Sequence, residues 1–320
     1  MPIREFDLID RYFSELTPVN TNVACGIGDD AAVLDVPDHQ DLLVSVDTLV
    51  NGVHFFSNTT SYDVGYKSLA VNISDIAAMG GLPRWATLAL TLPEIEEDWL
   101  AGFANGFADI ALKYGISLIG GDTTRGPLSI TVQIMGTVDT GQGLLRSGAK
   151  PGDLIYVSGY LGTAGLAYKA LAKNPVDDSI PAHCLERLHR PEPRVDLGQH
   201  LRNLATALID VSDGLAADLN HLLSSSGVAA EVQLEKLPVC KELESLADVN
   251  TIWQIALAAG DDYELCFTIA ADQKMELEKR TKNLSYPVTC IGEITSGEGI
   301  SWIEENGQAL TLKLDAYEHF

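Results

Sequence analysis

Apolar residues recur along this chain with two different spacings, and the two spacings predict a mixed fold of strands and helices. A period of two predicts strands, and a period near 3.6 predicts helices. We expect strands over 41–47, 86–92, 128–137, 154–159, 206–210, 262–269 and 287–294, a short strand leading into Gly120-Gly121-Asp122, and helices over 63–79, 96–114, 161–172 and 213–226. This mixture is typical of α/β or α+β domains, in which ligands gather at strand ends.

The strand at 41–47 and the helix at 63–79 each carry a polar face beside an apolar one. In the strand DLLVSVD, Leu42, Val44 and Val46 share one face, while Ser45 and Asp47 lie on the other. In the helix, a separate polar stripe with i, i+4 and i+7 spacing is formed by Ser68, Asn72 and Asp75. We expect Asp63 to cap this helix and Gly80-Gly81 to end it.

The chain is long enough for two domains. At 320 residues it exceeds what a single hydrophobic core usually supports. Ser147–Asp153 is rich in turn-forming residues and leads into a predicted strand, so it is the best boundary. The predicted domains are residues 1–148 and 149–320.

Composition and charge exclude several classes of protein. A net charge of −24 makes direct attraction to nucleic acid or to an anionic membrane improbable. The five cysteines are scattered and show no CxxC spacing, which argues against cysteine-bound zinc and favours a reduced, cytoplasmic protein. The first residues lack the apolar run of a signal peptide, and no segment has the roughly 18 apolar residues of a membrane span.

Aspartates beside Gly, Ser or Thr recur at predicted turns and strand ends. They occur in Gly28-Asp29-Asp30, Ser45-Val46-Asp47-Thr48, Asn72-Ile73-Ser74-Asp75, Gly120-Gly121-Asp122, Asp210-Val211-Ser212-Asp213 and Gly260-Asp261-Asp262. Carboxylates that are brought together repel one another unless a cation joins them. Mg²⁺ takes oxygen ligands and commonly binds together with phosphates. The pattern therefore predicts a metal and phosphate site.

Each cluster also has an ordinary explanation when it is considered alone. Ser212 or Asp213 could simply cap the helix that follows, although capping does not explain Asp210 at the end of an apolar strand. The other clusters could be solvated strand edges, exposed helix positions or turns. His54 follows the Asp47 strand, and Arg146 precedes the domain boundary, where a guanidinium can hold phosphate or simply face solvent. The joint occurrence of the clusters favours a site.

Several familiar nucleotide and catalytic motifs are absent from the sequence. There is no Walker A sequence, no set of protein-kinase motifs and no Ser/His/Asp signature. The fragment Gly159–Thr163 does not fit the dinucleotide-binding pattern.

The clusters taken together, in order and over essentially the whole chain, resemble the thiamine-monophosphate kinase family. The matching segments are GIGDDAAVL (26–34), VDTLVNGVH (46–54), GYKSLAVNISDIAAMGG (65–81), GGDTTRG (120–126), RSGAKPGD (146–153), DVSDGL (210–215), GDDYEL (260–265) and YEHF (317–320). The wider superfamily of aminoimidazole ribonucleotide synthetase and selenophosphate synthetase shares only parts of this set.

The resemblance implies an activity, an architecture and a set of site residues. The activity is ATP-dependent phosphorylation of thiamine monophosphate to thiamine diphosphate. The architecture is an N-terminal domain whose small sheet pairs with its copy in a homodimer, followed by a C-terminal α/β domain. The residues implied for several Mg²⁺ ions are Asp30, Ser45, Val46 (through its backbone carbonyl), Asp47, Asp75, Asp122, Asp210 and Asp213; those implied for ATP are Gly121, Asp122, Arg146 and Ser212; those implied for the substrate are His54, Asp261 and Tyr317. Position 261 holds aspartate where the family often has glutamate.

The implied chemistry is direct in-line transfer, because the acceptor phosphate is already largely ionised near neutral pH, with a second pKa of about 6. No strong general base is therefore needed, and we assign none; Asp47, Asp75 and Asp122 support the transfer through Mg²⁺. Two alternatives remain open at this point: another ATP-using enzyme of the superfamily, making selenophosphate or an amidine product, and a noncatalytic thiamine-phosphate or cation binding protein.

Overall fold

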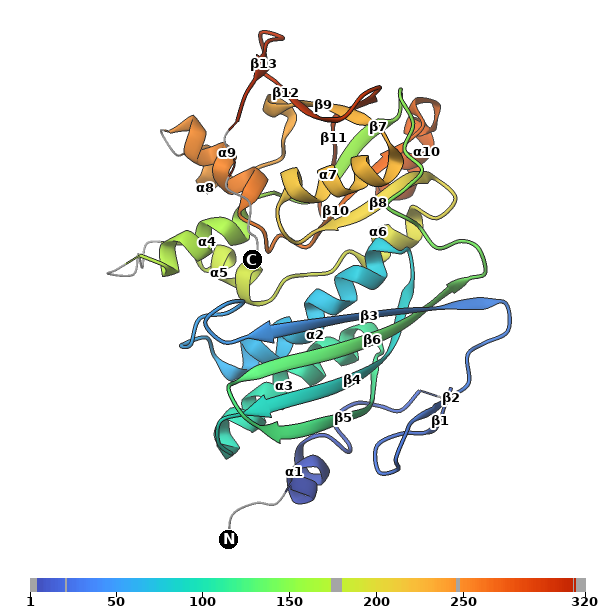
Figure 1. Ribbon diagram of the computed structural model, residues 1–320, viewed down its shortest axis with the longest axis vertical. Helices are drawn as coiled ribbons and strands as arrows, with labels where there is room; N and C mark the ends of the chain where they lie inside the picture. The colour runs from blue at the N-terminus through green and yellow to red at the C-terminus, as the bar shows by residue number, and fades with distance from the viewer. Residues whose placement is uncertain (1–4, 21, 174–179, 246–247, 313, 315–320) are drawn as a thin grey trace. The chain divides into compact units, whose positions relative to one another are not determined.

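The computed structural model describes residues 5–20, 22–173, 180–245, 248–312 and 314 (Figure 1). The chain divides into two compact units: an N-terminal unit of Met1–Ile76 and Gly81–Gly141, and a C-terminal unit of Ala77–Gly80 and Gln142–Phe320. Both combine helices with sheets, so the predicted two-domain α/β architecture is confirmed. The exact boundary at 148/149 stays a prediction. None of the helices in the described ranges combines the length and hydrophobicity that crossing a membrane requires.

The N-terminal unit is built on a four-stranded sheet with the order β3-β6-β4-β5. Its elements are α1 (Glu5–Tyr12), β1 (Val23–Cys25), β2 (Val33–Leu34), β3 (Gln40–Val50), α2 (Ser61–Ala78), β4 (Leu82–Leu92), α3 (Glu97–Tyr114), β5 (Ser117–Arg125) and β6 (Ser129–Asp139). Strands β3 and β4 both run antiparallel to β6, whereas β4 and β5 are parallel. Helices α2 and α3 cover one face of this sheet (Figure 1).

The opposite face of β3 carries apolar side chains that are exposed to solvent in the single chain. Leu42, Val44 and Val46 are 44%, 53% and 58% exposed, whereas the intervening residues face the helices and are less exposed. The alternation predicted for 41–47 is thus confirmed, and the strand extends beyond both ends of that range. We call Leu42, Val44 and Val46 the apolar stripe of β3.

The sequence predicts where helix α2 ends, but not which residue caps its N-terminus. Thr60, not Asp63, provides the N-terminal cap: its hydroxyl accepts the Asp63 amide at 3.2 Å and donates to the Asp63 carboxylate at 2.7 Å. The prediction that Asp63 caps the helix is therefore wrong by one helical turn. At the other end the predicted stop is confirmed, since Gly80 has φ = 67° and the Gly81 amide donates to the Ile76 carbonyl at 2.9 Å.

The C-terminal unit contains a seven-stranded sheet with the order β13-β12-β9-β11-β7-β10-β8. Its elements are β7 (Leu154–Ser158), α4 (Thr163–Leu171), α5 (Ala182–His189), α6 (Val195–His200), β8 (Ala205–Val211), α7 (Leu215–Ser226), β9 (Ala229–Gln233), a 3₁₀ turn at Leu234–Lys236, α8 (Lys241–Glu244), α9 (Val249–Ala258), β10 (Glu264–Ile269), a second 3₁₀ turn at Ala271–Gln273, α10 (Lys274–Thr281), β11 (Val288–Thr295), β12 (Gly299–Ile303) and β13 (Ala309–Leu310). Strand β8 is an edge strand that pairs antiparallel with β10.

A buried cluster fixes the β7–β10–β8 end of this sheet. Tyr156 stacks on Phe267 with ring centroids 5.5 Å apart, and Leu208 and Leu265 pack in the same cluster as helix α6. Because β8 and β10 are antiparallel neighbours, the end of β8 lies beside the beginning of β10. The core therefore brings the segments around Asp210 and Asp261 together.

Candidate functional site

In the N-terminal unit, β3 and α2 bring their polar faces together. The Ser45 hydroxyl donates to the Asp75 carboxylate at 2.5 Å, and the Asp47 amide donates to the Asn72 side-chain oxygen at 3.1 Å. Asn72 is fully buried, and its side-chain amide is held by the Ser68 carbonyl at 3.0 Å. The period-2 face of the strand and the helical polar stripe thus meet, placing Ser45, Asp47 and Asp75 close together at one site.

A second group of predicted residues lines a cavity of about 770 Å³ in the same unit. Asp29, Asp30 and Asp122 line it, together with Gly121 and residues of helix α1. Gly121 is needed there, because a Cβ would lie 1.9 Å from the Leu88 carbonyl oxygen on the neighbouring strand. Gly120-Gly121-Asp122 lies inside β5 and not in a turn after it, so the predicted end of that strand is corrected.

The His54 ring is oriented by the backbone of the turn that follows β3. Its Nδ1 accepts the Val50 amide at 3.0 Å, and the buried Lys67 ammonium donates to the His54 carbonyl at 3.3 Å. An imidazole that accepts at Nδ1 carries its proton on Nε2 when neutral. The ring therefore has a defined donor atom on its other side.

In the C-terminal unit, the end of β8 collects three carboxylates. Asp210 is buried, and Asp213 and Asp218 lie near it. Burial, followed by the charges of Asp210 and Asp213, raises the pKa of Asp218 to about 8. Oxygen donors that repel one another in this way are suited to a hard divalent cation.

The sequence alternative in which Ser212 or Asp213 caps helix α7 is wrong. The N-cap is Gly214 and receives no side-chain cap. Instead, Asp218 in the first turn of α7 reaches back and accepts the Ser212 and Asp213 amides, each at 3.0 Å. Asp218 fixes this turn, and sequence reasoning missed it because its position looks like an ordinary helix residue.

The segment 260–263 lies beside this turn and is tied to it by backbone bonds. The Asp261 amide donates to the Ser212 carbonyl at 2.8 Å, and the Tyr263 amide donates to the Val211 carbonyl at 2.8 Å. The predicted substrate residue Asp261 thus has a fixed position relative to the predicted ATP residue Ser212.

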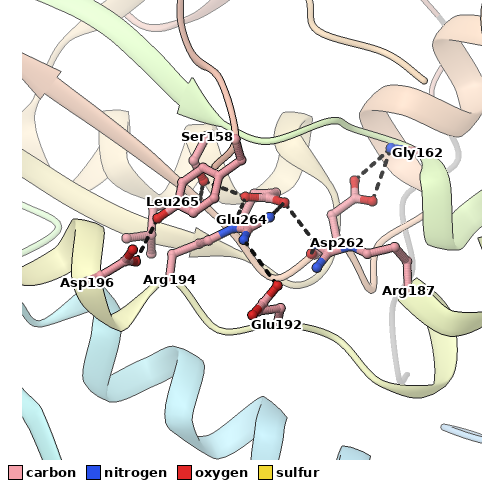
Figure 2. A network of polar contacts seen from close by, with 10 residues as sticks. Ser158, Gly162, Arg187, Glu192, Arg194, Asp196, Asp262, Glu264 and Leu265 are labelled. Atoms are coloured by element: carbon pink, nitrogen blue, oxygen red, sulfur yellow. Dashed lines mark hydrogen bonds and ion pairs between the residues drawn. The ribbon is translucent and has the colours of Figure 1, made fainter. Parts of the chain in front are cut away.

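Behind this segment lies a buried ionic network, shown in Figure 2. Glu264 is 1% exposed, and its carboxylate accepts Arg194 Nε at 2.7 Å and Arg194 Nη2 at 2.6 Å. Arg187 Nη2 and the Ser158 hydroxyl also donate to it, at 2.8 and 2.6 Å. The segment GDDYEL contains Glu264, but no pattern in the sequence indicates its partners.

Asp262 is also buried, and it anchors the start of helix α4. Its two carboxylate oxygens accept the Gly162 amide at 3.1 and 2.9 Å (Figure 2). Burial raises the pKa of Asp262 to about 8, with the Gly162 hydrogen bond and then Arg187 acting in the opposite direction. Gly159–Thr163, which does not fit a dinucleotide motif, is thus explained by packing: a Cβ at Gly159 would lie 2.1 Å from the Glu264 carboxylate.

Arg146 is exposed and lies beside the middle of β8. The neighbouring Leu145 carbonyl accepts the Leu208 amide at 2.8 Å, and the Arg146 carbonyl accepts the Ser226 hydroxyl at 3.3 Å. Its backbone is therefore fixed to the β8 and α7 layer, while its side chain faces outward. Tyr317, the remaining predicted substrate residue, lies outside the described residues.

One further group of possible ligands lies apart from the predicted residues. The His183 ring nitrogen is 3.4 Å from the Glu242 carboxylate and 3.5 Å from the Cys184 sulfur. Burial raises the pKa of the Cys184 thiol to about 11, so at neutral pH the sulfur is a protonated, poor metal ligand. We interpret this group as an ion pair beside a core thiol.

Comparison with known proteins places these residues in a family. Residues 28–138 match the AIR synthase related protein, N-terminal domain, and residues 150–303 match the corresponding C-terminal domain. The chain is 45% identical to the thiamine-monophosphate kinase of Escherichia coli K12, over 100% of this chain and 99% of that protein. The chain belongs to the thiamine-monophosphate kinase family. The resemblance found in the sequence is therefore confirmed.

Solved structures of the family agree with this fold. The crystal structure of thiamine-monophosphate kinase from Stenotrophomonas maltophilia K279a matches with a TM-score of 0.86 and 46% identity, covering 97% of this chain and 99% of that one. AaThiL, complexed with AMPPCP and TMP, matches with a TM-score of 0.75 and 33% identity, covering 89% of each chain. The second structure holds AMPPCP and TMP in one complex.

The burial of Asp262 predicts a stability change that depends on pH. Its folded pKa of about 8 exceeds the ordinary value of 3.8, so the folded state keeps its proton while the unfolded state loses it. The contribution of Asp262 to stability should therefore fall as pH rises from about 4 to 8 and level off above that. Asp262→Asn keeps an acceptor for Gly162 and removes this titration.

We expect the excess in free energy of unfolding of Asp262→Asn over wild type to grow between pH 5 and pH 8.5 by more than about 1.4 kcal/mol, the value of one pKa unit. Urea unfolding followed by tryptophan fluorescence measures the difference. Asp98→Asn, at an exposed position in α3, serves as the control and should show no such trend. A difference that stays constant between the two pH values would contradict the assignment.

Proposed function

We propose that this chain transfers the γ-phosphoryl group of ATP to thiamine monophosphate, giving thiamine diphosphate and ADP, the last step of thiamine diphosphate synthesis. The observation that carries the proposal is the match of the entire chain to thiamine-monophosphate kinases, including AaThiL complexed with AMPPCP and TMP. Transfer is direct and in line, without a phosphorylated enzyme intermediate.

Several Mg²⁺ ions are held by the clustered carboxylates. In the N-terminal unit the ligands are Asp30, Ser45, the Val46 carbonyl, Asp47, Asp75 and Asp122; in the C-terminal unit they are Asp210 and Asp213. The oxygen-only donor sets support Mg²⁺ over softer metals. When bound, the ions would screen the phosphates of donor and acceptor from each other and stabilise the charge of the transferring group.

The remaining predicted residues divide between the two anionic ligands. Gly121, Asp122, Arg146 and Ser212 bind ATP, and His54, Asp261 and Tyr317 bind thiamine monophosphate. The exposed Arg146 guanidinium suits phosphate oxygens because its donors form a planar fork. His54 suits an anion because its Nδ1 accepts a backbone amide, which leaves Nε2 as the donor.

The proposed reaction requires positioning and charge compensation more than proton transfer. The acceptor phosphate is largely ionised, with a second pKa of about 6, so no group has to remove a proton. The side chains need to hold two anions in line, and such positioning can supply on the order of 7–11 kcal/mol of the barrier in favourable systems. This is consistent with a site built from aspartates and one arginine.

We further propose that the chain works as a homodimer in the cytoplasm, with residues 1–148 forming the metal-binding and dimerisation domain and residues 149–320 the second domain. The apolar stripe of β3 supports a second copy as partner, because contiguous exposed apolar strand residues are typical of an interface. The five free cysteines fit a reducing compartment.

A coupled assay of ADP release tests the activity. Thiamine monophosphate should support ADP and thiamine diphosphate formation with ATP and Mg²⁺. Free thiamine should not, because it lacks the anionic acceptor. ADP release with selenide or formylglycinamidine ribonucleotide in place of thiamine monophosphate would favour the alternative enzymes. Binding of thiamine monophosphate without ATP consumption would favour a noncatalytic protein.

Substitution of three aspartates tests the metal assignment. Asp47→Asn, Asp75→Asn and Asp122→Asn should each lower kcat by about 100-fold or more, because each removes charge that stabilises the transferring group. Circular dichroism should show an unchanged fold. The matched control Asp98→Asn should retain activity. Near-wild-type turnover of all three variants at limiting Mg²⁺ would rule out the proposed ligand set.

A charge in the apolar stripe tests the dimer. Val44→Asp should convert dimers to monomers in sedimentation velocity, since burying an unpaired carboxylate in an interface is unfavourable. Val249→Asp introduces the same charge at a residue that is 57% exposed on α9, and this control should leave the mass unchanged. A wild-type protein that sediments as a monomer would contradict the proposal directly.

A further inference from the structure

The segment between α9 and β10 has an unusual backbone. Gly260, Asp261 and Tyr263 have φ values of 70°, 62° and 49°. Residues with a side chain adopt this left-handed region rarely, and they keep it only where surrounding contacts impose it. The conformation of Asp261 is therefore set by its neighbours and not by local preference.

Contacts with β8 supply one part of this constraint. The Asp261 and Tyr263 amides donate to the Ser212 and Val211 carbonyls, each at 2.8 Å. These bonds hold the backbone on the β8 side. They do not involve the peptide carbonyl of Asp262, which lies between the two donors.

Arg187 supplies the other part. Its Nη2 donates to the Asp262 carbonyl at 2.8 Å and to the Glu264 carboxylate at 2.8 Å (Figure 2). One guanidinium nitrogen from helix α5 thus joins the left-handed segment to the first residue of β10. Among the described contacts, the hydrogen bond from Arg187 is what connects the Asp262 carbonyl to a charged side chain.

The network behind Arg187 makes its position well defined. The Glu264 carboxylate accepts four donors, from Arg194 twice, Arg187 and Ser158. A buried carboxylate satisfied in this way has a single favourable arrangement, because any shift leaves a charge unpaired. Arg194 is further fixed by stacking over the Tyr286 ring at 3.8 Å.

We propose that Arg187 is a positioning residue for thiamine monophosphate, acting through the 260–263 segment. The inference rests on the proposed function, in which Asp261 contacts the substrate. Arg187 orients the peptide next to Asp261 and does not itself touch the reacting atoms. Arg194 retains the charge balance of Glu264 when Arg187 is replaced. Since the Arg187 side chain is 21% exposed, its loss does not open a fully buried space.

The test compares Arg187→Met with Arg187→Lys in steady-state kinetics. Arg187→Met should raise the KM for thiamine monophosphate about tenfold or more, since small misplacements of a binding group carry large losses. The KM for ATP should stay unchanged, because Asp218 continues to hold Ser212 and Asp213. Arg187→Lys should recover most of the loss, because an ammonium has donors for both the carbonyl and the carboxylate.

Hydrogen–deuterium exchange gives a readout that does not depend on activity. Peptides covering 259–265 should exchange faster in Arg187→Met than in wild type, while peptides of β8 upstream of Asp210 should be unchanged. The matched control is Arg190→Met, which removes an arginine 3.8 Å from Glu186 just after the same helix. It should alter neither KM nor the exchange of 259–265.

Three results would overturn the inference: an unchanged KM for thiamine monophosphate in Arg187→Met, equal increases in both KM values, or unchanged exchange of 259–265. A lower melting temperature with wild-type kinetics would mean that Arg187 is merely structural. If the wild-type protein does not phosphorylate thiamine monophosphate, the proposed function fails. The exchange result then decides alone whether Arg187 holds the segment.

Discussion

Repulsion between carboxylates is the constraint on which the rest of this structure depends. A chain with a net charge of −24 brings aspartates together in both units, and neighbouring protein groups offset part of that repulsion. The Ser45 hydroxyl donates to Asp75, backbone amides donate to Asp218, and the Gly162 amide donates to Asp262, on which Arg187 also acts. At Glu264, by contrast, two arginines donate directly to one buried carboxylate.

This distribution separates two kinds of acidic residue. Glu264 is neutralised by protein groups on all sides, so it can serve only as part of the framework. Asp30, Asp122 and Asp213 are exposed and available to ligands. A hydroxyl or amide stabilises a carboxylate modestly, and a divalent ion can add to it, whereas a bidentate arginine occupies the same lone pairs. The exposed aspartates can therefore still accept a divalent ion, whereas the Glu264 carboxylate is already occupied by protein donors.

Sequence reasoning succeeded where a regular period determined the outcome. Ser45 and Asp47 were placed on one strand face, and Asn72 and Asp75 on one helix stripe, and the two faces meet because both elements are regular. It failed where a backbone group took a hydrogen-bond partner that the periodic pattern does not specify. Asp218 accepts amides of a preceding turn, Thr60 replaces Asp63 as the cap, and Gly120-Gly121-Asp122 continues a strand because β4 pairs with it. The Glu264 network joins residues from β7, α5 and the segment before α6, and no local pattern predicts such a set.

Strand β3 has a consequence for how this protein can change. Its side chains alternate between the residues that meet α2 and the apolar stripe, so the proposed metal ligands and the proposed subunit contact occupy the same eleven residues. An insertion or deletion of one residue in the strand would exchange the two faces, placing valines against Asp75 and aspartate in the contact. Both surfaces therefore depend on the register of one strand. Changes in β3 must preserve the alternation of its side chains between the two faces as well as the side chains themselves.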